Sequence, residues 1–222
     1  MFSKKRQQNK QKNQAAQAAL ECIETGMIVG LGSGSTVACL IEYLPEISGR
    51  LEGVVASSQA TAHMVQQYDI PVLDLNTVGD IPLYIDSADE VNAAKQMIKG
   101  GGGALTGERI VASASEQFIC IVDHSKYVQV LGEYPVAIEV IPMARSLVAR
   151  QIVKLGGSPV YRQGFTTDYD NLILDVYNLD LTDPRSMERE LTMLPGVVSC
   201  GIFAEHPADS VIVADSKGIE WL

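Results

Sequence analysis

Four consecutive glycines, Gly100–Gly103, lie between a lysine, Lys99, and a glutamate, Glu108, that the next helix would hold. Glycine loses more conformational entropy on folding than any other residue, so this backbone must need unusual freedom. A loop without side chains can approach a ligand and donate its amides to ligand oxygens. A carboxylate facing amides and an ammonium group is an arrangement for abstracting a proton beside a carbonyl. The alternative, a flexible linker, is disfavoured because apolar segments flank the glycines.

A second glycine-rich stretch, "GLGSGST" (Gly30–Thr36), follows a short apolar run. It fails the dinucleotide fingerprint because Ser35 stands where the third glycine is needed, and it lacks the GK[ST] of a P-loop. A glycine turn with hydroxyls remains, leading into a helix N-terminus. Free amides and the helix dipole favour an anion there, although an ordinary helix cap is the alternative.

The acidic stretch "DSADE" places three carboxylates in five residues, Asp86–Glu90. Like charges this close raise the pKa of at least one carboxyl unless a cation compensates, and Lys99 and Lys126 are the candidate cations. The alternatives are a solvated acidic turn and a divalent metal site. The three histidines and four cysteines are scattered without the spacing of metal ligands. We therefore expect no metal and no cofactor, and reduced cysteines indicate a cytoplasmic protein.

Strands and helices alternate over the first two thirds of the chain, which predicts a parallel sheet covered on both faces. Helices are expected over 13–24 and 144–155, and from the tetraglycine to 115. One more helix begins near 35, and another follows the strand over 53–58 and ends at 68. The expected strands are 27–31, 53–58, 70–75, 81–86, 118–123 and 136–141. The polar stretches "GLGSGST" and "DSADE" follow expected strands, as do "SSQAT" (57–61) and "DHSK" (123–126). Because ligands bind beyond the carboxyl ends of parallel strands, we expect these clusters to form one site.

The pattern changes after Gly156, where a hairpin over 159–177, a helix over 184–194 and a strand over 197–203 precede a last strand over 211–215. We predict a basic polar tail (1–14), a Rossmann-like domain (15–142 and 205–222) and a smaller α+β domain (143–204). The first twelve residues hold five bases and no acid, and we expect this tail to be frayed and dispensable.

Composition excludes several classes of protein. The 222 residues carry a net charge of −10, and nearly a third of the bases lie in the tail, so nucleic acid is a poor partner. No apolar run approaches the roughly 20 residues of a membrane span, and no apolar stretch follows the charged N-terminus as in a signal peptide. We expect neither nucleic acid nor membrane among the partners.

Taken together, the stretches resemble ribose-5-phosphate isomerase, type A. The resemblance runs from Gly26 to Phe203 and depends on the order and spacing of these motifs: "GLGSGST", "SSQAT", "YIDSADE", "KGGGGALTGERIVA", "VDHSK", "LGEYPVAIEVIPMA" and "LPGVVSCGIF". It implies an α/β fold with a Rossmann-like domain and a smaller α+β, ferredoxin-like domain. It also implies a metal-independent aldose–ketose isomerase of the pentose phosphate pathway. Such an enzyme interconverts ribose 5-phosphate and ribulose 5-phosphate through a cis-enediolate, usually as a homodimer or dimer of dimers.

The resemblance also implies roles for particular residues. Glu108 matches the catalytic base, and Asp86, Asp89 and Lys99 match further catalytic residues. The substrate-binding residues would be Ser33, Gly34, Ser35, Thr36, Asp86, Ser87, Ala88, Asp89, Lys99, Gly100, Gly101, Gly102 and Lys126. The residues alone do not determine which loop binds the phosphate end of the sugar and which binds the carbonyl end.

The chain departs from the family's pattern at four places. Ser33 stands for a threonine, Ser87 for a glycine, Gly107 for a basic residue, and "TDYDN" (167–171) for TDNGN. Glycine beside Glu108 weakens the helix by up to about 1 kcal/mol. A non-catalytic sugar-phosphate sensor is one alternative, but it should have lost Glu108 or gained a DNA-binding segment. An acyl-CoA transferase relative is another, but it would need a CoA pocket and generally a longer chain.

A first prediction follows from the scattered histidines. Isomerase activity towards ribose 5-phosphate should persist after exhaustive treatment with EDTA, because proton transfer through an enediolate needs no metal bridging both oxygens. Activity that disappears on chelation and returns with a divalent ion would favour a hydride shift instead.

Overall fold

The computed structural model describes residues 2–222, with side chains from Lys5 onward. Contacts between Cα atoms divide the chain into two compact units, each described by itself. Unit 1 comprises Met1–Ser87, Gly107–Tyr127 and Ala208–Leu222, and unit 2 comprises Ala88–Thr106 and Val128–Pro207. The chain therefore passes between the units four times.

Unit 1 is built on a six-stranded sheet in the order β13-β12-β6-β3-β1-β2. The strands are β1 (Met27–Leu31), β2 (Leu51–Ala56), β3 (Leu83–Asp86), β6 (Phe118–Asp123), β12 (Ser210–Ala214) and β13 (Ile219–Trp221). All neighbours pair in parallel except β12 and β13, which are antiparallel. The carboxyl ends of β1, β2, β3 and β6 consequently lie at one edge of the sheet, as the sequence predicted.

Helices cover both faces of this sheet, which is why strands such as β6 are buried along their whole length. The helices α1 (Phe2–Leu20), α2 (Ser35–Tyr43) and α3 (Gln59–Gln66) pack over one core, in which Ala16, Leu40 and Ile121 are fully buried. On the other face, α4 (Leu105–Ser113) brings Val111 against Gly30 and Tyr84. The short 3₁₀ helices are η1 (Leu44–Arg50), η2 (Leu75–Thr77) and η3 (His124–Lys126).

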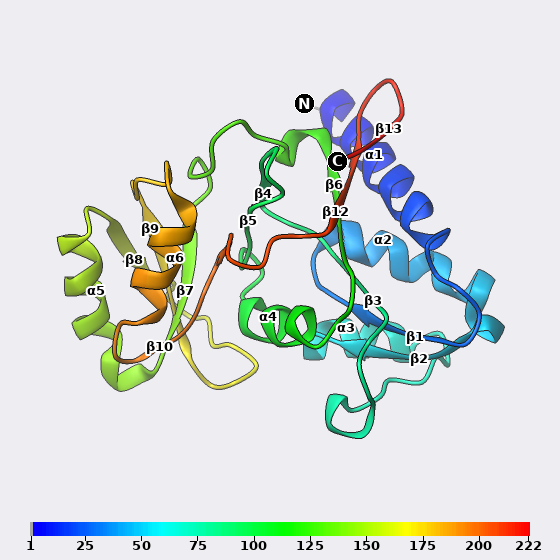
Figure 1. Cartoon of the computed structure of the whole chain (residues 1–222), viewed down its shortest axis with the longest axis horizontal. Coiled ribbons are helices and arrows are strands. Elements are labelled where there is room, and N and C mark those ends of the chain that lie inside the picture. Colours follow the sequence, from blue (N-terminus) through cyan, green and yellow to red (C-terminus); the bar gives the residue numbers. More distant parts are fainter. Residues whose placement is uncertain (1) are drawn as a thin grey trace. The chain divides into compact units, whose positions relative to one another are not determined.

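The expected N-terminal tail is wrong, because residues 2–20 form the single helix α1. Figure 1 shows α1, in dark blue, beside the red C-terminal strands. Ala15, Ala16 and Ala19 are fully buried, and Gln11, one helical turn earlier, is 9% exposed. The buried face of α1 therefore extends into residues 2–14, which composition alone predicted to be exposed to solvent. Its polar side chains find partners: the hydroxyl of Tyr43 donates to Asn13 Oδ1 at 3.1 Å.

Unit 2 contains a four-stranded antiparallel sheet in the order β10-β7-β9-β8. Its elements follow the chain order β7 (Val136–Val140), α5 (Arg145–Lys154), β8 (Ser158–Tyr161), β9 (Leu172–Tyr177), α6 (Pro184–Thr192) and β10 (Val197–Cys200), with η4 (Pro142–Ala144) before α5. This is the βαββαβ order of ferredoxin-like domains. Residues of α5 and α6 pack with alternate residues of β7 and β9, such as Ile138 and Leu174, in one core.

A second, small sheet completes unit 2, in the order β11-β5-β4. Its strands have two residues each: β4 (Glu90–Val91), β5 (Met97–Ile98) and β11 (Ile202–Phe203). Residues 88–106 and 128–142 thus belong to unit 2, and not to the Rossmann-like part in which the sequence placed them. The physical reason is pairing: β7 joins β9 and β10 in an antiparallel sheet, although its apolar run resembles a parallel strand.

Two expected strands are altered. Residues 70–75 form only an isolated bridge, between Val72 and Val54. The strand over 197–203 is broken at Gly201, where a Cβ would lie 2.3 Å from the carbonyl oxygen of Lys99. Only glycine permits this close approach between backbones. Gly201 can therefore pack against Lys99, whose amide donates to Gly201 O at 2.8 Å, and this bond holds the segment before the tetraglycine.

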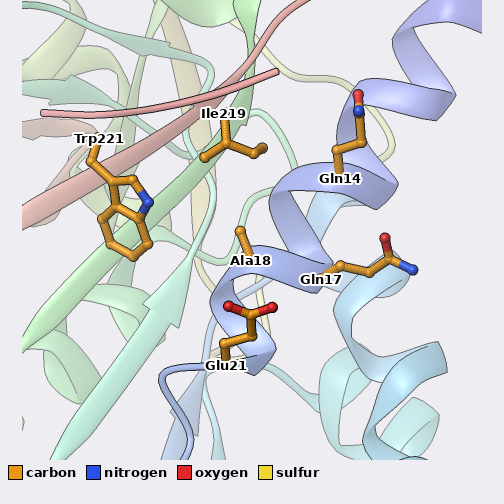
Figure 2. Close-up of a pocket in the computed structure, with 6 residues that line it drawn as sticks. All are labelled: Gln14, Gln17, Ala18, Glu21, Ile219 and Trp221. Atoms are coloured by element: carbon orange, nitrogen blue, oxygen red, sulfur yellow. The ribbon is translucent and has the colours of Figure 1, made fainter.

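A groove of about 380 Å³ lies between α1 and β13, lined by Gln14, Gln17, Ala18, Glu21, Ile219 and Trp221 (Figure 2). None of the candidate site residues lines it. Among residues 2–222, no helix combines the length and the apolar character needed to cross a membrane.

The buried stripe of α1 generates a second prediction. Deleting residues 1–13 should lower the melting temperature by about 4–8 °C, because losing about 2 kcal/mol shifts a domain of this size by roughly that much. Differential scanning calorimetry measures the shift. Deleting only residues 1–7 is the matched control, since Lys5, Arg6 and Gln7 are exposed, and it should change the melting temperature by less than about 2 °C. Equal effects of the two deletions would contradict a packed role for residues 8–13.

Candidate active site

The loop after β1 leads directly into helix α2, and Gly34 makes the turn with φ 95°. This left-handed conformation is unfavourable for other residues. The first backbone bond within the helix runs from Ala38 N to Gly34 O at 2.9 Å. The preceding amides, from Ser35 onward, therefore point out of the helix N-terminus. This is the anion-binding geometry that "GLGSGST" predicted.

Lys12, which sequence reasoning missed, brings a cation to this loop. Its Nζ donates to Ser35 Oγ at 2.9 Å, across 23 residues of sequence. Gln8, one turn earlier on α1, donates to both carboxylate oxygens of Asp123 at the end of β6. A signal existed in the sequence: the stripe Ala15, Ala19 and Ile23, continued backward at helical spacing, reaches Lys12 and Gln8.

The Asp86 carboxylate ties the loop after β1 to the end of β3. It is fully buried, and its Oδ1 accepts from Ser33 N at 2.9 Å and from Ser87 N at 2.6 Å. The buried hydroxyl of Tyr84 donates to Oδ2 at 2.5 Å. Gly32 makes room for this carboxylate, because a Cβ there would lie 1.8 Å from Asp86 Cγ. Asp86 is thus held in one orientation by donors on three sides.

Tyr84 remains a donor over a wide range of pH. Burial raises its pKa well above the ordinary value, and the neighbouring charges of Asp86 and Glu108 raise it further. The phenol therefore stays protonated at neutral and moderately alkaline pH. Its ring is fixed against Phe118, with the ring centroids 4.8 Å apart.

Glu108 lies in the first turn of α4 and is only 3% exposed. Ser33 Oγ donates to its Oε1 at 2.5 Å. Serine at this position therefore keeps the hydroxyl of the family's threonine, and that hydroxyl binds Glu108. The hydroxyl of Ser87, another departure from the family pattern, donates to Ser33 O at 2.9 Å. Within unit 1, the structure therefore brings together three of the predicted features: the loop "GLGSGST", the start of "DSADE" and Glu108.

The other predicted residues near the tetraglycine belong to unit 2. Asp89 Oδ2 accepts from Gly101 N at 2.8 Å, which joins the acidic stretch to the glycine loop. Lys99 is 2% exposed, with Nζ 5.6 Å from the centre of the Phe203 ring. Ala88 is also buried. Gly100 and Gly103 both have positive φ, which explains glycine at these two positions.

Lys126 ends η3, immediately after β6, and is partly buried. Its strand ends at the same edge of the sheet as β1 and β3, as expected from "DHSK". In the part of the chain that the structure describes, no three histidine, cysteine, aspartate or glutamate side chains form a group suited to a metal ion.

Comparison with known proteins identifies the family. The sequence model of ribose 5-phosphate isomerase A (phosphoriboisomerase A) matches residues 53–218. The chain belongs to the ribose 5-phosphate isomerase A family. It is 57% identical to ribose-5-phosphate isomerase A of Legionella pneumophila (strain Corby) over 211 residues, which are 95% of this chain and 98% of that protein.

Solved structures of ribose 5-phosphate isomerases agree with this assignment. The isomerase A of Neisseria gonorrhoeae superimposes with a TM-score of 0.95 and 45% identity, covering 97% of this chain and 96% of that one. That of Methanocaldococcus jannaschii gives 0.90 and 35% identity, covering 96% and 98%. A third isomerase, solved in complex with phospho-erythronic acid, gives 0.92 and 37% identity, covering 96% and 97%. The expected α/β, Rossmann-like fold is thereby confirmed, and the chain is an isomerase of this family.

A third prediction concerns the Tyr84 hydroxyl. Replacing Tyr84 by phenylalanine removes one donor from the buried Asp86 carboxylate, which should lower the free energy of unfolding by about 1–3 kcal/mol. Urea denaturation measures this loss. Tyr68→Phe is the matched control, because Tyr68 is 38% exposed, and it should change the stability by less than about 0.5 kcal/mol. Equal stabilities of the Tyr84→Phe variant and the parent protein would mean that the hydroxyl does not hold Asp86.

Proposed function

We propose that Glu108 is the base that moves the proton between C2 and C1 as the chain interconverts ribose 5-phosphate and ribulose 5-phosphate. The observation that carries this proposal is the placement of Glu108: a buried carboxylate in the first turn of α4, oriented by the Ser33 hydroxyl at 2.5 Å. Burial protects a base from competing water, and one hydrogen bond to Oε1 fixes its direction without neutralising it.

A carboxylate is a weak base and the proton α to an aldehyde is a weak acid, so base strength alone does not suffice. The developing enediolate must meet preorganised donors, each worth roughly 3–4 kcal/mol. We assign this role to Lys99 and to the amides of Gly100 and Gly102, with Gly101 between them, whose own amide donates to Asp89. Asp86 and Asp89 would hold the sugar hydroxyls and assist ring opening, with Ser87 and Ala88 beside them.

We place the phosphate at the N-terminus of α2, formed by Ser33, Gly34, Ser35 and Thr36. Helix amides and the positive end of the dipole favour an anion there, and Lys12 adds a cation beside Ser35. Lys126 is the second cation that we assign to the substrate. Losing Lys12 should therefore raise KM for ribose 5-phosphate. The variant that lacks residues 1–13 also lacks Lys12, so its KM tests this assignment.

We further propose a homodimer or dimer of dimers located in the cytoplasm. Support for the location comes from the four cysteines, all of which lie within the described residues and none of which forms a disulfide. Light scattering of the purified protein measures its mass, and a monomer would contradict the oligomeric part of this proposal.

A fourth prediction tests the base. Glu108→Gln keeps the shape and the acceptor for Ser33 Oγ, but an amide cannot take the C2 proton. Turnover should fall by 10²–10⁴-fold, with kcat affected more than KM. Glu116→Gln is the matched control, because Glu116 is exposed just beyond α4, and its kcat should stay within about twofold of the parent value.

The parent enzyme should also incorporate solvent deuterium at C1 of the ketose, because a carboxylic acid can exchange its proton before returning it. The decisive result is the kcat of the Glu108→Gln variant. A near-native value would remove Glu108 from the role of base, and Asp86 or Asp89 would be tested next.

A further inference from the structure

One arginine holds the tetraglycine loop by its carbonyls. Arg162 follows β8, and its guanidinium lies against the loop although 61 residues separate it from Gly101. Nη1 and Nη2 both donate to Gly100 O at 3.3 Å, and Nη1 also donates to Gly101 O at 3.3 Å. One side chain is therefore hydrogen-bonded to the carbonyls of two successive residues of the loop.

The guanidinium is itself fixed on its other side. Nε donates to Asp175 Oδ2 at 2.9 Å and Nη2 to Asp175 Oδ1 at 2.5 Å, which is a bidentate pair. Both side chains are only 18% exposed. The planar fork matches a carboxylate on one edge and leaves further N–H groups for the carbonyls, which an ammonium group cannot do with the same geometry. The Phe165 ring lies beneath the guanidinium, 5.3 Å away.

The loop needs such a support because glycine has little conformational preference of its own. Asp89 accepts from the Gly101 amide at 2.8 Å, and Phe165 packs where a side chain on Gly103 would lie. These contacts fix two points of the loop. The carbonyls of Gly100 and Gly101 determine how the peptide planes between those points are turned.

We propose that Arg162 is a positioning residue for the isomerisation: by binding the carbonyls of Gly100 and Gly101, it aims the glycine amides that meet the developing enediolate. In a trans peptide the C=O and the next N–H point in opposite directions. Holding Gly101 O against Arg162 therefore directs the Gly102 N–H away from Arg162. The guanidinium charge also polarises the peptide, which strengthens that N–H as a donor. The inference rests on the proposed function, in which these amides contact the substrate.

The experiment compares Arg162→Lys, which keeps the charge but loses the fork, with Arg162→Met, which loses both. Arg189→Met is the matched control, because Arg189 is 69% exposed in an ion pair with Glu205. For each folded variant, kcat and KM for ribose 5-phosphate are measured, together with the inhibition constant of phospho-erythronate, whose carboxylate resembles the two oxygens of the enediolate.

We expect kcat to fall about 10–100-fold in Arg162→Met and at least about fivefold in Arg162→Lys, with KM changed less than about threefold in both. Phospho-erythronate should bind more weakly by about the same factor as kcat falls, because both report on the enediolate. Arg189→Met should leave all three constants within about twofold. A purely structural role would lower the amount of folded protein without separating kcat from KM.

Two results would overturn the inference: kcat within twofold of the parent value in a folded Arg162 variant, or a rise in KM that accounts for the whole loss of kcat/KM. If Arg162→Met does not fold, Arg162→Lys decides alone by the same criteria. The parent protein separates this question from the proposed function. A parent without activity towards ribose 5-phosphate contradicts the function, whereas an active parent with unaffected Arg162 variants contradicts only the role of Arg162.

Discussion

The buried carboxylate of Asp86 is the constraint on which the arrangement in unit 1 depends. A charge without access to water is tolerated only when donors replace the water, and here two backbone amides and one phenol do so. Because one of those amides belongs to Ser33, satisfying Asp86 also sets the loop after β1. Ser33 in turn orients Glu108 through its hydroxyl. The position of the candidate base thus follows from the need to solvate a different carboxylate.

Buried carboxylates also bind backbone amides and side-chain donors in unit 2. Glu90 accepts from the amides of Gly132 and Tyr134, and Glu188 accepts from those of Ala204 and Glu205. Glu139, fully buried in β7, accepts from Thr106, Thr167 and Asn171. Each carboxylate fastens a loop with no regular pairing of its own. An acidic protein of this kind uses part of its negative charge inside the fold, where the charge organises backbone donors.

Glu139 also accounts for one departure from the family pattern. It anchors the turn 167–171, in which Asp170 stands where the family has glycine and adopts φ 60°. Aspartate tolerates this left-handed conformation better than most residues, although less well than glycine. The hydrogen bonds from Thr167 and Asn171 hold the turn on both sides of the strained position, so the substitution is accommodated.

Much of unit 1 could be predicted from the sequence because its strands are continuous apolar runs bounded by glycine or polar turns. The rule that ligands gather at the carboxyl edge of parallel strands then placed Ser33 and Asp86 in one region, whereas Glu108 was found from its position after the tetraglycine and from the resemblance. The two-residue strands β4, β5 and β11 have no periodicity to detect. The apolar run of β7 fits a parallel or an antiparallel sheet equally well, so its domain was assigned wrongly. Tyr84 and Arg162 could not be chosen from similar residues, because what distinguishes them is a contact made in the fold, with Asp86 and with the tetraglycine loop respectively.

The packing of α1 has a consequence for the order of folding. The helix packs against β6 and β12, both of which lie far from it in the sequence. Ala15, Ala16 and Ala19 therefore have no finished surface to cover until β6 and β12 have paired. Closing loops of this length costs conformational entropy before the contacts are gained, so we expect α1 to dock late in folding. The contact of Lys12 with Ser35 would form in that same late step.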